Sequence, residues 1–487
     1  MEQWALEFEN ISRRINSEFY LTDINLKIAP GQVHAFVGKN AAGKSSLFKT
    51  LVGIFPPDRG SLYVFGKKSR IASPVEAKAL GITLIAQNSE MFENLSVCEN
   101  MFMNTPDFTS GKLGLIDRKG MRAKAARVFQ DMGVSINPDS PVSQLSRSEK
   151  QLMMIASALV GDSKIILLDE TSTHLSQEEC EVLNDSINAM KAKGITFLLV
   201  SHRLDQILAV SDAISVMERG AVIRTAPVSE FSFALLTELI TGYSVEDLYH
   251  KPPVEWGEPV LELEGVSGPG FADISLKILS GQIVAVVGRH SSGKQQLARL
   301  LGGFESAKGS MRIDGKPITS PTIMEAMLAG VSYSQSSRDD WVITWLDRYM
   351  ESHPVQTKAQ QVKAQVALWW AVSAKSLSNM MAGFMRFNER NNATGGYIQR
   401  ELTNKALDRR AKLYILCEPT AGLDVSAKMG VYARLGDKIQ QGSSVLLVTS
   451  DFEEAKGMAD CIVFMEEGRI TRQIQRQDPQ WDQLRAH

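Results

Sequence analysis

Residues 38–45 have the pattern of a loop that binds phosphate groups. They read GKNAAGKS, which fits G-x-x-x-x-G-K-[S/T], and the apolar run VHAFV precedes them. Glycines let backbone N–H groups approach phosphate oxygens, and the start of a following helix favours their negative charge. Lys44 adds a positive charge, and the hydroxyl of Ser45 can bind Mg²⁺. The predicted phosphate-binding residues are Gly38, Lys39, Asn40, Ala41, Ala42, Gly43, Lys44, Ser45 and Ser46.

Two carboxylates and a histidine follow two other apolar runs. The run IILLD ends at Asp169, whose oxygens are hard ligands of the kind that Mg²⁺ binds. Glu170 comes next and can orient and polarise an attacking water as a general base. The run FLLVS is followed directly by His202, which we predict to act beside the two carboxylates. Gln87 follows the run GITLIA; taken alone, it fits a solvated loop residue.

These residues can act together only if a common sheet holds them. The short runs VHAFVG, IILLD and FLLVS are typical of strands buried on both faces, as in a parallel sheet. Amphipathic stretches at 150–160 and 178–191 predict helices between such strands. The pattern therefore predicts an α/β fold with the chemical residues at the ends of its strands.

The second half of the chain repeats the first. The stretch DINLKIAPGQVHAFVG from Asp23 matches DISLKILSGQIVAVVG from Asp273, 250 residues later. Further on the offset is 248 residues, as between Asp169 and Cys417. A period this long indicates a duplicated domain, and prolines interrupt the pattern in EDLYHKPPVEWGEP. We predict a first domain over 1–245, a linker over 246–257 and a second domain over 258–487.

Composition narrows the class of protein. The 487 residues are 44% hydrophobic and 22% charged, which is typical of a globular protein with several domains. The net charge is −2 and no block of like charges stands out, so the sequence shows no source for the electrostatic attraction that drives nucleic-acid binding. No apolar run approaches the ~20 residues that a membrane span needs. The cysteines lie far apart without CxxC spacing, which argues against disulfides and a zinc site.

The order of these motifs resembles the nucleotide-binding domains of ABC transporters. The family places a loop glutamine and an LSGGQ-like signature between the phosphate loop and the Asp-Glu strand, and these correspond to Gln87 and LSRSEKQ at 145–151. The tandem arrangement, with FENLSVCENMFM and EPTAGLDVSAK, is similar to the ATPase subunit of monosaccharide-type bacterial importers. The resemblance implies two ABC-type domains, each with a mainly parallel sheet and a helical subdomain. It also implies ATP and Mg²⁺, with Ser45, Gln87 and Asp169 as metal ligands.

The resemblance further implies two composite sites, each between the phosphate loop of one domain and the signature of the other. The first combines the intact first-half residues with the second-half signature ATGGYIQ, which contributes Thr394, Gly395 and Gly396. Glu170 and His202 are its expected catalytic residues. The adenine base would stack on an aromatic side chain; Ile15 occupies the aligned position, and Phe19 or Tyr20 could replace it.

The second site departs from the family pattern. Its loop retains Gly288, Gly293 and Lys294, and Glu418 keeps the general-base position. Its Mg²⁺ ligands are lost, because Gln295 replaces the serine and Cys417 the aspartate. Ser336 and Ser450 replace the glutamine and the histidine, and the signature facing the site keeps Ser146 without its glycines. We expect one ATP to be hydrolysed; the second site is then regulatory or empty, or the second half is a scaffold.

The resemblance predicts the ATPase subunit of a complex that imports a sugar or a similar small polar solute. Its partners would be two integral-membrane permease subunits and a solute-binding protein, with no nucleic acid. It would lie on the cytoplasmic face of the bacterial inner membrane, attached through the permease only. A nucleoside or autoinducer-2 is an alternative solute. A soluble tandem ABC ATPase acting on ribosomes or DNA is the alternative of another class, and a structural pseudo-ATPase is a third reading.

Overall fold

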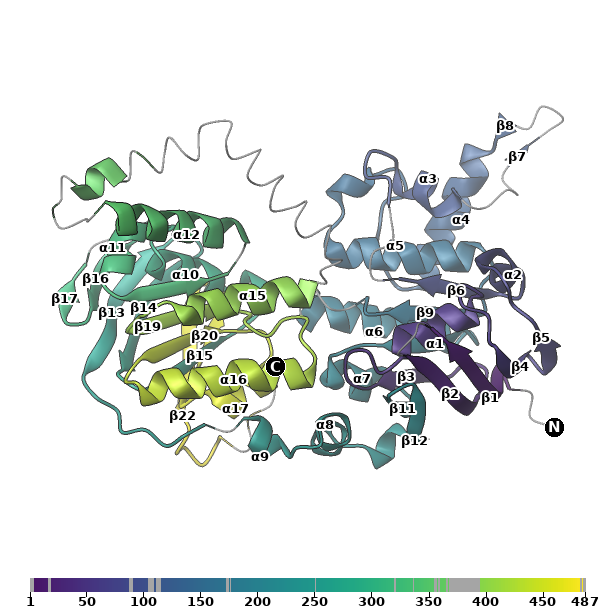
Figure 1. The fold of residues 1–487 in the computed structure, drawn as a ribbon. Helices are drawn as coiled ribbons and strands as arrows, with labels where there is room; N and C mark the ends of the chain where they lie inside the picture. Colours follow the sequence, from purple (N-terminus) through teal and green to yellow (C-terminus); the bar gives the residue numbers. More distant parts are fainter. Residues whose placement is uncertain are drawn as a thin grey trace. The chain divides into compact units, whose positions relative to one another are not determined.

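The computed structural model describes residues 4–15, 19–86, 91–103, 109–110, 115–171, 175, 177–249, 251–318, 321–335, 337–353, 357, 360–364, 367, 395–481 and 484. Its contacts divide the chain into two units, Met1–Val245 and Glu246–His487. In Figure 1 the first unit runs from purple to teal and the second from teal to yellow. Among the described residues, no helix combines the length and the apolar character needed to cross a membrane.

The core of the first unit is a six-stranded sheet in the order β12-β11-β3-β10-β9-β6 (Figure 1). Its strands are β3 (Val33–Val37), β6 (Ile82–Ile85), β9 (Ile165–Asp169), β10 (Thr196–Val200), β11 (Ala213–Glu218) and β12 (Ala221–Pro227). All pairs are parallel except β11 with β12. Every residue of β3, β9 and β10 is buried, as the continuous apolar runs predict. The predicted α/β fold is confirmed.

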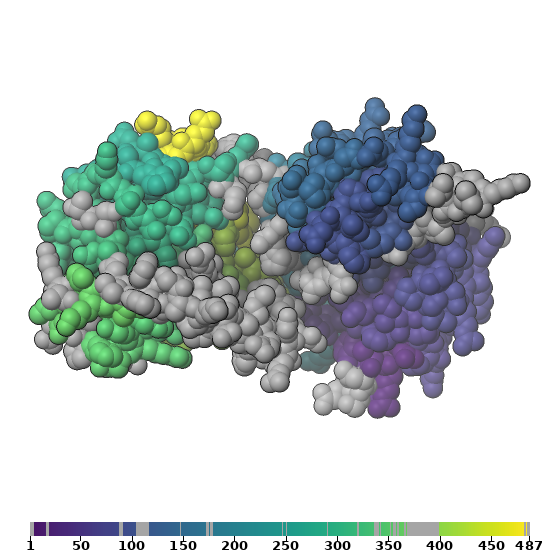
Figure 2. All heavy atoms as spheres, turned by 90° about the horizontal axis from the view of Figure 1, so that it is seen from above, coloured from purple at the N-terminus to yellow at the C-terminus, as the bar shows by residue number. Residues whose placement is uncertain are grey.

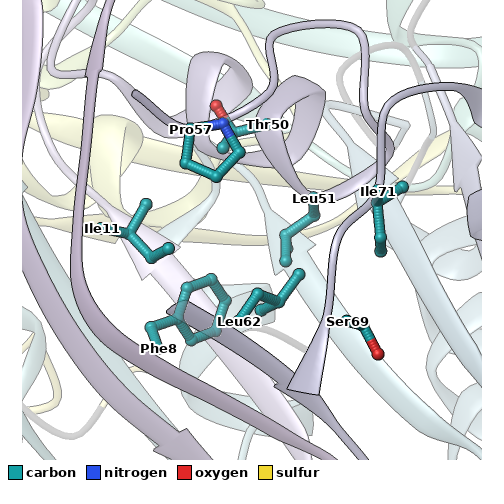
Figure 3. A pocket seen from close by; sticks show the side chains of 8 residues that line it. All are labelled: Phe8, Ile11, Thr50, Leu51, Pro57, Leu62, Ser69 and Ile71. Carbon is teal, nitrogen blue, oxygen red and sulfur yellow. The ribbon is translucent and has the colours of Figure 1, made fainter. Parts of the chain in front are cut away.

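A four-stranded antiparallel sheet supports the helix that follows the phosphate loop. Its order is β2 (Tyr20–Ile28), β1 (Leu6–Arg14), β4 (Arg59–Val64) and β5 (Lys67–Ser69). Figure 3 shows Phe8 and Leu62 from this sheet and Leu51 from α1 (Lys44–Leu51) lining one small apolar pocket. Leu47, Phe48 and Leu51 of α1 belong to the same apolar core as this sheet, so the helix packs against it.

Helices cover the sheets of the first unit, and the predicted helices at 150–160 and 178–191 are confirmed as α5 and α6. The bounds are α2 (Pro74–Ala79), α3 (Val97–Phe102), α4 (Arg118–Asp131), α5 (Arg147–Val160), α6 (Gln177–Lys191), α7 (Leu204–Val210) and α8 (Phe233–Thr241). Helices α3, α4 and α5 pack on one another as a helical subdomain, beside the short strands β7 (Thr109–Ser110) and β8 (Leu115–Ile116).

The second unit repeats this topology. Its six-stranded sheet has the order β18 (Val331–Ser334), β19 (Leu413–Cys417), β20 (Ser444–Val448), β15 (Ile283–Val287), β21 (Cys461–Glu466) and β22 (Arg469–Gln475). Its antiparallel sheet has the order β14 (Phe271–Leu279), β13 (Pro259–Gly268), β16 (Lys308–Ile313) and β17 (Lys316–Pro317). Its helices are α10 (Lys294–Leu301), α11 (Ile323–Leu328), α12 (Ser337–Ser352), α15 (Gly395–Asp408), α16 (Val425–Gln440) and α17 (Phe452–Met458). The duplication inferred from the sequence is therefore present in the fold.

The segment between the two repeats packs on the second unit. It begins with α9 (Val245–Leu248), and the ring of Tyr249 lies 5.2 Å from that of Tyr432. Lys251 forms an ion pair with Asp460, and both side chains are nearly buried. These contacts hold the segment against α16 and β21 of the second unit.

A histidine lies in the middle of the first unit's sheet. His34 on β3 is buried, and its Nε2 is 2.8 Å from the hydroxyl of Ser215 on β11. Val284 occupies the same place on β15, 250 residues later. Burial lowers the pKa of His34 from 6.5 to about 4, because the charged ring would lose its hydration.

This burial predicts an acid sensitivity of the first unit. Above pH 6.5 the ring is neutral whether the chain is folded or unfolded, and it contributes no pH dependence. Between pH 6.5 and about 4 only the unfolded chain binds the proton, which costs about 3 kcal/mol of stability in total. His34→Val, which copies the second unit, should remove that loss. Hydrogen exchange of β3 peptides at pH 6.8 and 4.5 measures it; an equal acid loss in the variant would contradict the assignment.

Candidate active site

The loop between β3 and α1 has backbone conformations that its glycines permit. Gly38 has φ 153°, and a Cβ there would lie 2.2 Å from the carbonyl oxygen of Met217. Gly43 has φ 108° and stands directly before α1, where no side chain caps the first turn. The loop therefore passes close to β11 and presents the start of a helix, which is the arrangement that favours an anion.

Lys44 is folded into the loop. Its Nζ donates hydrogen bonds to the carbonyl oxygens of Gly38 and Lys39, at 2.8 and 2.9 Å, and its side chain is buried. Lys39, Asn40 and Ala41 are exposed, whereas Ser45 and Ser46 are half-buried. The side chain of Lys44 is thus buried, whereas residues 39–41 of the same loop are exposed.

Two oxygen atoms of the kind that bind Mg²⁺ lie close together at the start of α1. The Ser45 hydroxyl on α1 donates a hydrogen bond of 2.9 Å to Oδ1 of Asp169 at the end of β9. Burial raises the pKa of Asp169, and the bond from Ser45 opposes that rise. A hydroxyl and a carboxylate oxygen at this distance fit Mg²⁺, which prefers oxygen ligands.

Glu170 and His202 form a pair at the ends of neighbouring strands. Val200 on β10 lies opposite Asp169 on β9, so the residues that follow both strands are brought together. The His202 Nε2–H donates to Oε1 of Glu170 at 2.8 Å, because a carboxylate can only accept. Burial acts to raise the pKa of Glu170, but the hydrogen bond and charge of His202 outweigh it and lower the pKa. Glu170 is therefore an anion able to accept a proton.

The structure thus brings together Lys44, Ser45, Asp169, Glu170 and His202. Gln87 and Thr394 lie outside the described residues. Gly395 and Gly396 are the first residues of α15 in the second unit.

Among the candidates for stacking on a base, Phe19 is the one beside the loop. A Cβ on Gly43 would lie 3.1 Å from Cζ of Phe19, so the ring touches the start of α1. Ile15 packs with Phe19 against the core of the first unit. Tyr20 is 45% exposed, with the Arg14 guanidinium 5.5 Å from its ring centre.

The corresponding loop of the second unit has the same backbone and a different lysine contact. Gly288 and Gly293 have φ of 157° and 88°, close to those of their counterparts. Lys294, however, donates to the carbonyl oxygen of Thr449 at 3.0 Å and lies 3.5 Å from Oε1 of Glu418. Its side chain is only 1% exposed. The lysine therefore has a carboxylate of its own chain as counter-ion.

Glu418 is tied by further bonds. Its Oε2 accepts hydrogen bonds from the backbone N–H and the hydroxyl of Ser450, both at 3.1 Å. Gln295 and the buried Cys417 occupy the positions of Ser45 and Asp169. An amide and a thiol do not replace the hydroxyl–carboxylate pair, so these residues do not fit Mg²⁺. Ser336 lies outside the described residues.

The altered signature of the first unit is a helix cap. Ser146 precedes α5; its hydroxyl accepts from the N–H of Glu149 at 3.2 Å, and Glu149 accepts from the N–H of Ser146 at 2.8 Å. This capping box occupies both the hydroxyl and the backbone N–H of Ser146. Arg147 and Ser148 stand where the signature has its two glycines, and Glu149 places a negative charge where it has a neutral glutamine, which disfavours a phosphate there.

Sequence reasoning missed one residue near the reactive pair. Arg203 follows His202 and donates from Nη1 to the carbonyl oxygen of Leu175 at 3.0 Å. In the sequence, only its position directly after His202 could have indicated that Arg203 lies near the site.

A family profile described as ABC transporter matches residues 21–173 and 271–421. The chain is 31% identical to the ribose import ATP-binding protein RbsA 2 of Rubrobacter xylanophilus, over 99% of this chain and 94% of that one. It is 30% identical to the ribose import ATP-binding protein RbsA of Lactococcus lactis subsp. cremoris, over 96% and 95% of the two chains. A solved nucleotide-free ATP-binding cassette from an ABC transporter matches 46% of this chain and 91% of its own, with 26% identity and a TM-score of 0.40.

Proposed function

Because the chain belongs to the ABC transporter family, we propose that it is the ATPase subunit of a sugar import complex. It couples the binding and hydrolysis of ATP to the uptake of the solute. The observation that carries the proposal is the cluster of Lys44, Ser45, Asp169, Glu170 and His202 at one edge of a parallel sheet. Ribose is the first solute to test, since two relatives are named as ribose import proteins.

In the proposed reaction, the phosphates of ATP lie on the loop over 38–46. Lys44 leaves the carbonyl oxygens of Gly38 and Lys39 and donates to phosphate oxygens instead. Ser45 and Asp169 would hold Mg²⁺, which would neutralise charge on the phosphates when bound. Phe19 is the proposed stacking partner of adenine, because its ring touches Gly43.

Glu170 is the proposed general base. Its lowered pKa keeps the carboxylate ionised at neutral pH, so it accepts the proton of the water that attacks the terminal phosphate. His202 orients this carboxylate through the 2.8 Å hydrogen bond to Oε1. Gln87, Thr394, Gly395 and Gly396 are proposed to complete the site.

The second site is proposed not to hydrolyse ATP. Lys294 is neutralised by Glu418, and the residues at the metal positions do not fit Mg²⁺. The proposed domains are 1–245 and 258–487, joined by 246–257. The first would supply the catalytic residues, and the second would supply the signature residues Thr394, Gly395 and Gly396.

The proposed partners are two integral-membrane permease subunits and a solute-binding protein, with the chain on the cytoplasmic face of the membrane. Phe92 is 55% exposed and precedes α3 of the helical subdomain in the chain; Figure 2 draws the residues of this subdomain in blue. Asn100 on α3 holds the backbone of Phe92 through both its N–H and its carbonyl oxygen, at 2.9 and 3.0 Å. Met91 and Leu95, close to Phe92 in the sequence, are half-buried, and apolar side chains gathered at a surface suit a protein contact.

Phe92→Asp should therefore detach the chain from its permease without weakening nucleotide binding. Co-purification of the complex and binding of an ATP analogue measure the two effects. Ile223→Asp is the matched control, because Ile223 is 48% exposed on β12, outside the helical subdomain. A Phe92→Asp chain recovered with the permease at the normal yield would contradict the docking assignment.

The function itself is tested by assembling the chain with the permease subunits of its complex and measuring phosphate release in proteoliposomes. We expect solute-loaded binding protein to stimulate hydrolysis and the labelled solute to enter the vesicles. Sedimentation of the chain with ribosomes instead of membranes would contradict the proposal.

A further inference from the structure

The side chain of Arg203 connects two segments that carry the reactive pair. Nη1 donates to the carbonyl oxygen of Leu175 at 3.0 Å and contacts Sγ of Cys180 at 3.1 Å. Nη2 donates to Asp205 at 3.1 Å, within the first turn of α7. The backbone N–H of Arg203 donates to the hydroxyl of Ser201 at 3.1 Å. The guanidinium thus spans the loop after β10, the segment after β9 and the first turn of α6.

The surroundings make this a defined contact. The Arg203 side chain is only 23% exposed, and both Leu175 and Cys180 are buried. Burial raises the pKa of Cys180 to about 11, so the sulfur is a neutral thiol that accepts the bond. Because the guanidinium is planar, its contacts with Leu175, Cys180 and Asp205 fix the position of the Arg203 side chain better than a single contact would.

The second unit has a different pair at the same two positions. Asp451 lies 248 residues after Arg203, and Lys428 lies 248 residues after Cys180. Lys428 Nζ and Asp451 Oδ2 form an ion pair of 2.5 Å between α16 and the start of α17. In the first unit the positive charge lies on Arg203, after β10, whereas in the second it lies on Lys428, which corresponds to Cys180. A polar side-chain contact nevertheless joins the two corresponding segments in both units.

We propose that Arg203 is a positioning residue for hydrolysis, which holds the His202 loop against the segment that follows Glu170. The inference rests on the proposed function of the first unit. Arg203 is the next residue after His202, and Leu175 lies five residues after Glu170, so the bridge closes a short ring through the reactive pair. If the bridge opens, the 2.8 Å contact between His202 and Glu170 loses its support.

Arg203→Met keeps the apolar stem and removes every donor. We expect the kcat for phosphate release in the assembled complex to fall about 10- to 100-fold, because a misplacement of about 1 Å has effects of this size. The KM for ATP should change less than about threefold, since the phosphate loop is untouched. Arg203→Lys, which retains one donor, should recover part of kcat.

A charge-exchange experiment makes the test specific. Arg203→Asp alone places a carboxylate against the Leu175 carbonyl oxygen and should lose as much kcat as Arg203→Met. Combining it with Cys180→Lys reproduces the Lys428–Asp451 pair and should recover kcat at least about tenfold. Lys428→Met is the matched control, because it breaks the corresponding bridge in the second unit; turnover should stay within about twofold of the unmodified chain.

Turnover of Arg203→Met within twofold of normal would overturn the proposal. A loss of kcat with an equal rise in KM, and without recovery in either Arg203→Lys or the exchanged pair, would mean that Arg203 only stabilises the fold. Thermal unfolding of each variant accompanies the kinetics. An active Glu170→Gln chain would instead refute the proposed function, so the two failures are distinct.

Discussion

Glu170→Gln should bind ATP normally and release almost no phosphate. The amide keeps the size of the carboxylate but cannot accept a proton, and general-base catalysis contributes about 10²–10⁴-fold in rate. In the structure Glu170 is an anion, its pKa lowered by His202 against the effect of burial. Steady-state phosphate release and binding of a fluorescent ATP analogue, both with the permease present, separate turnover from affinity.

The matched variant is Glu418→Gln in the second unit. Glu418 follows Cys417 in place of an aspartate and already bonds to Lys294 and Ser450. The Glu418→Gln substitution should therefore change the rate of phosphate release by less than about twofold. Equal loss in the two variants would mean that the second unit also hydrolyses ATP, and near-normal turnover in Glu170→Gln would refute the assignment of the first unit.

Lys44→Ala and Lys294→Ala should also have very different effects on transport. Lys44 is proposed to donate to the phosphates, and loss of one electrostatic contact to the transition state typically costs about 10²–10³-fold in rate. Transport by Lys44→Ala should therefore be abolished. Lys294 bonds to Thr449 and Glu418 in its own unit, so Lys294→Ala should leave transport within about threefold.

The second lysine should instead contribute to stability. Removing it leaves Glu418, which is 27% exposed, without its counter-ion, at a cost of about 1–3 kcal/mol to the second unit. Solute uptake by whole cells and thermal unfolding of the purified chain measure the two effects. Equal loss of uptake in both variants would contradict the asymmetry.

Much of the fold could be predicted from the sequence because strands buried on both faces leave continuous apolar runs. The runs at β3, β9 and β10 also located the residues that follow them, since parallel strands end at the same edge of the sheet. The proximity of Ser45 to Asp169 and of Glu170 to His202 follows from that geometry.

Contacts that depend on side-chain direction could not be predicted. Lys44 and Lys294 both follow the last glycine of their loops, yet one bonds to its own loop and the other to Glu418 and Thr449. The Arg203 bridge joins residues 28 and 23 positions apart, with partners whose types change between the two units. Spacing alone carries no signal for such pairs.

The central claim is that the first unit alone turns over ATP, and trapping the product state tests it most directly. The assembled complex is incubated with Mg²⁺, vanadate and a radiolabelled photoreactive azido-ATP, illuminated after removal of free nucleotide, and digested. We expect one nucleotide per chain, trapped as the diphosphate and attached to a peptide of the first unit, and no trapped diphosphate in a Glu170→Gln complex, because trapping with vanadate requires hydrolysis. Equal trapping by the Glu170→Gln complex, or two trapped nucleotides per chain, would contradict the claim.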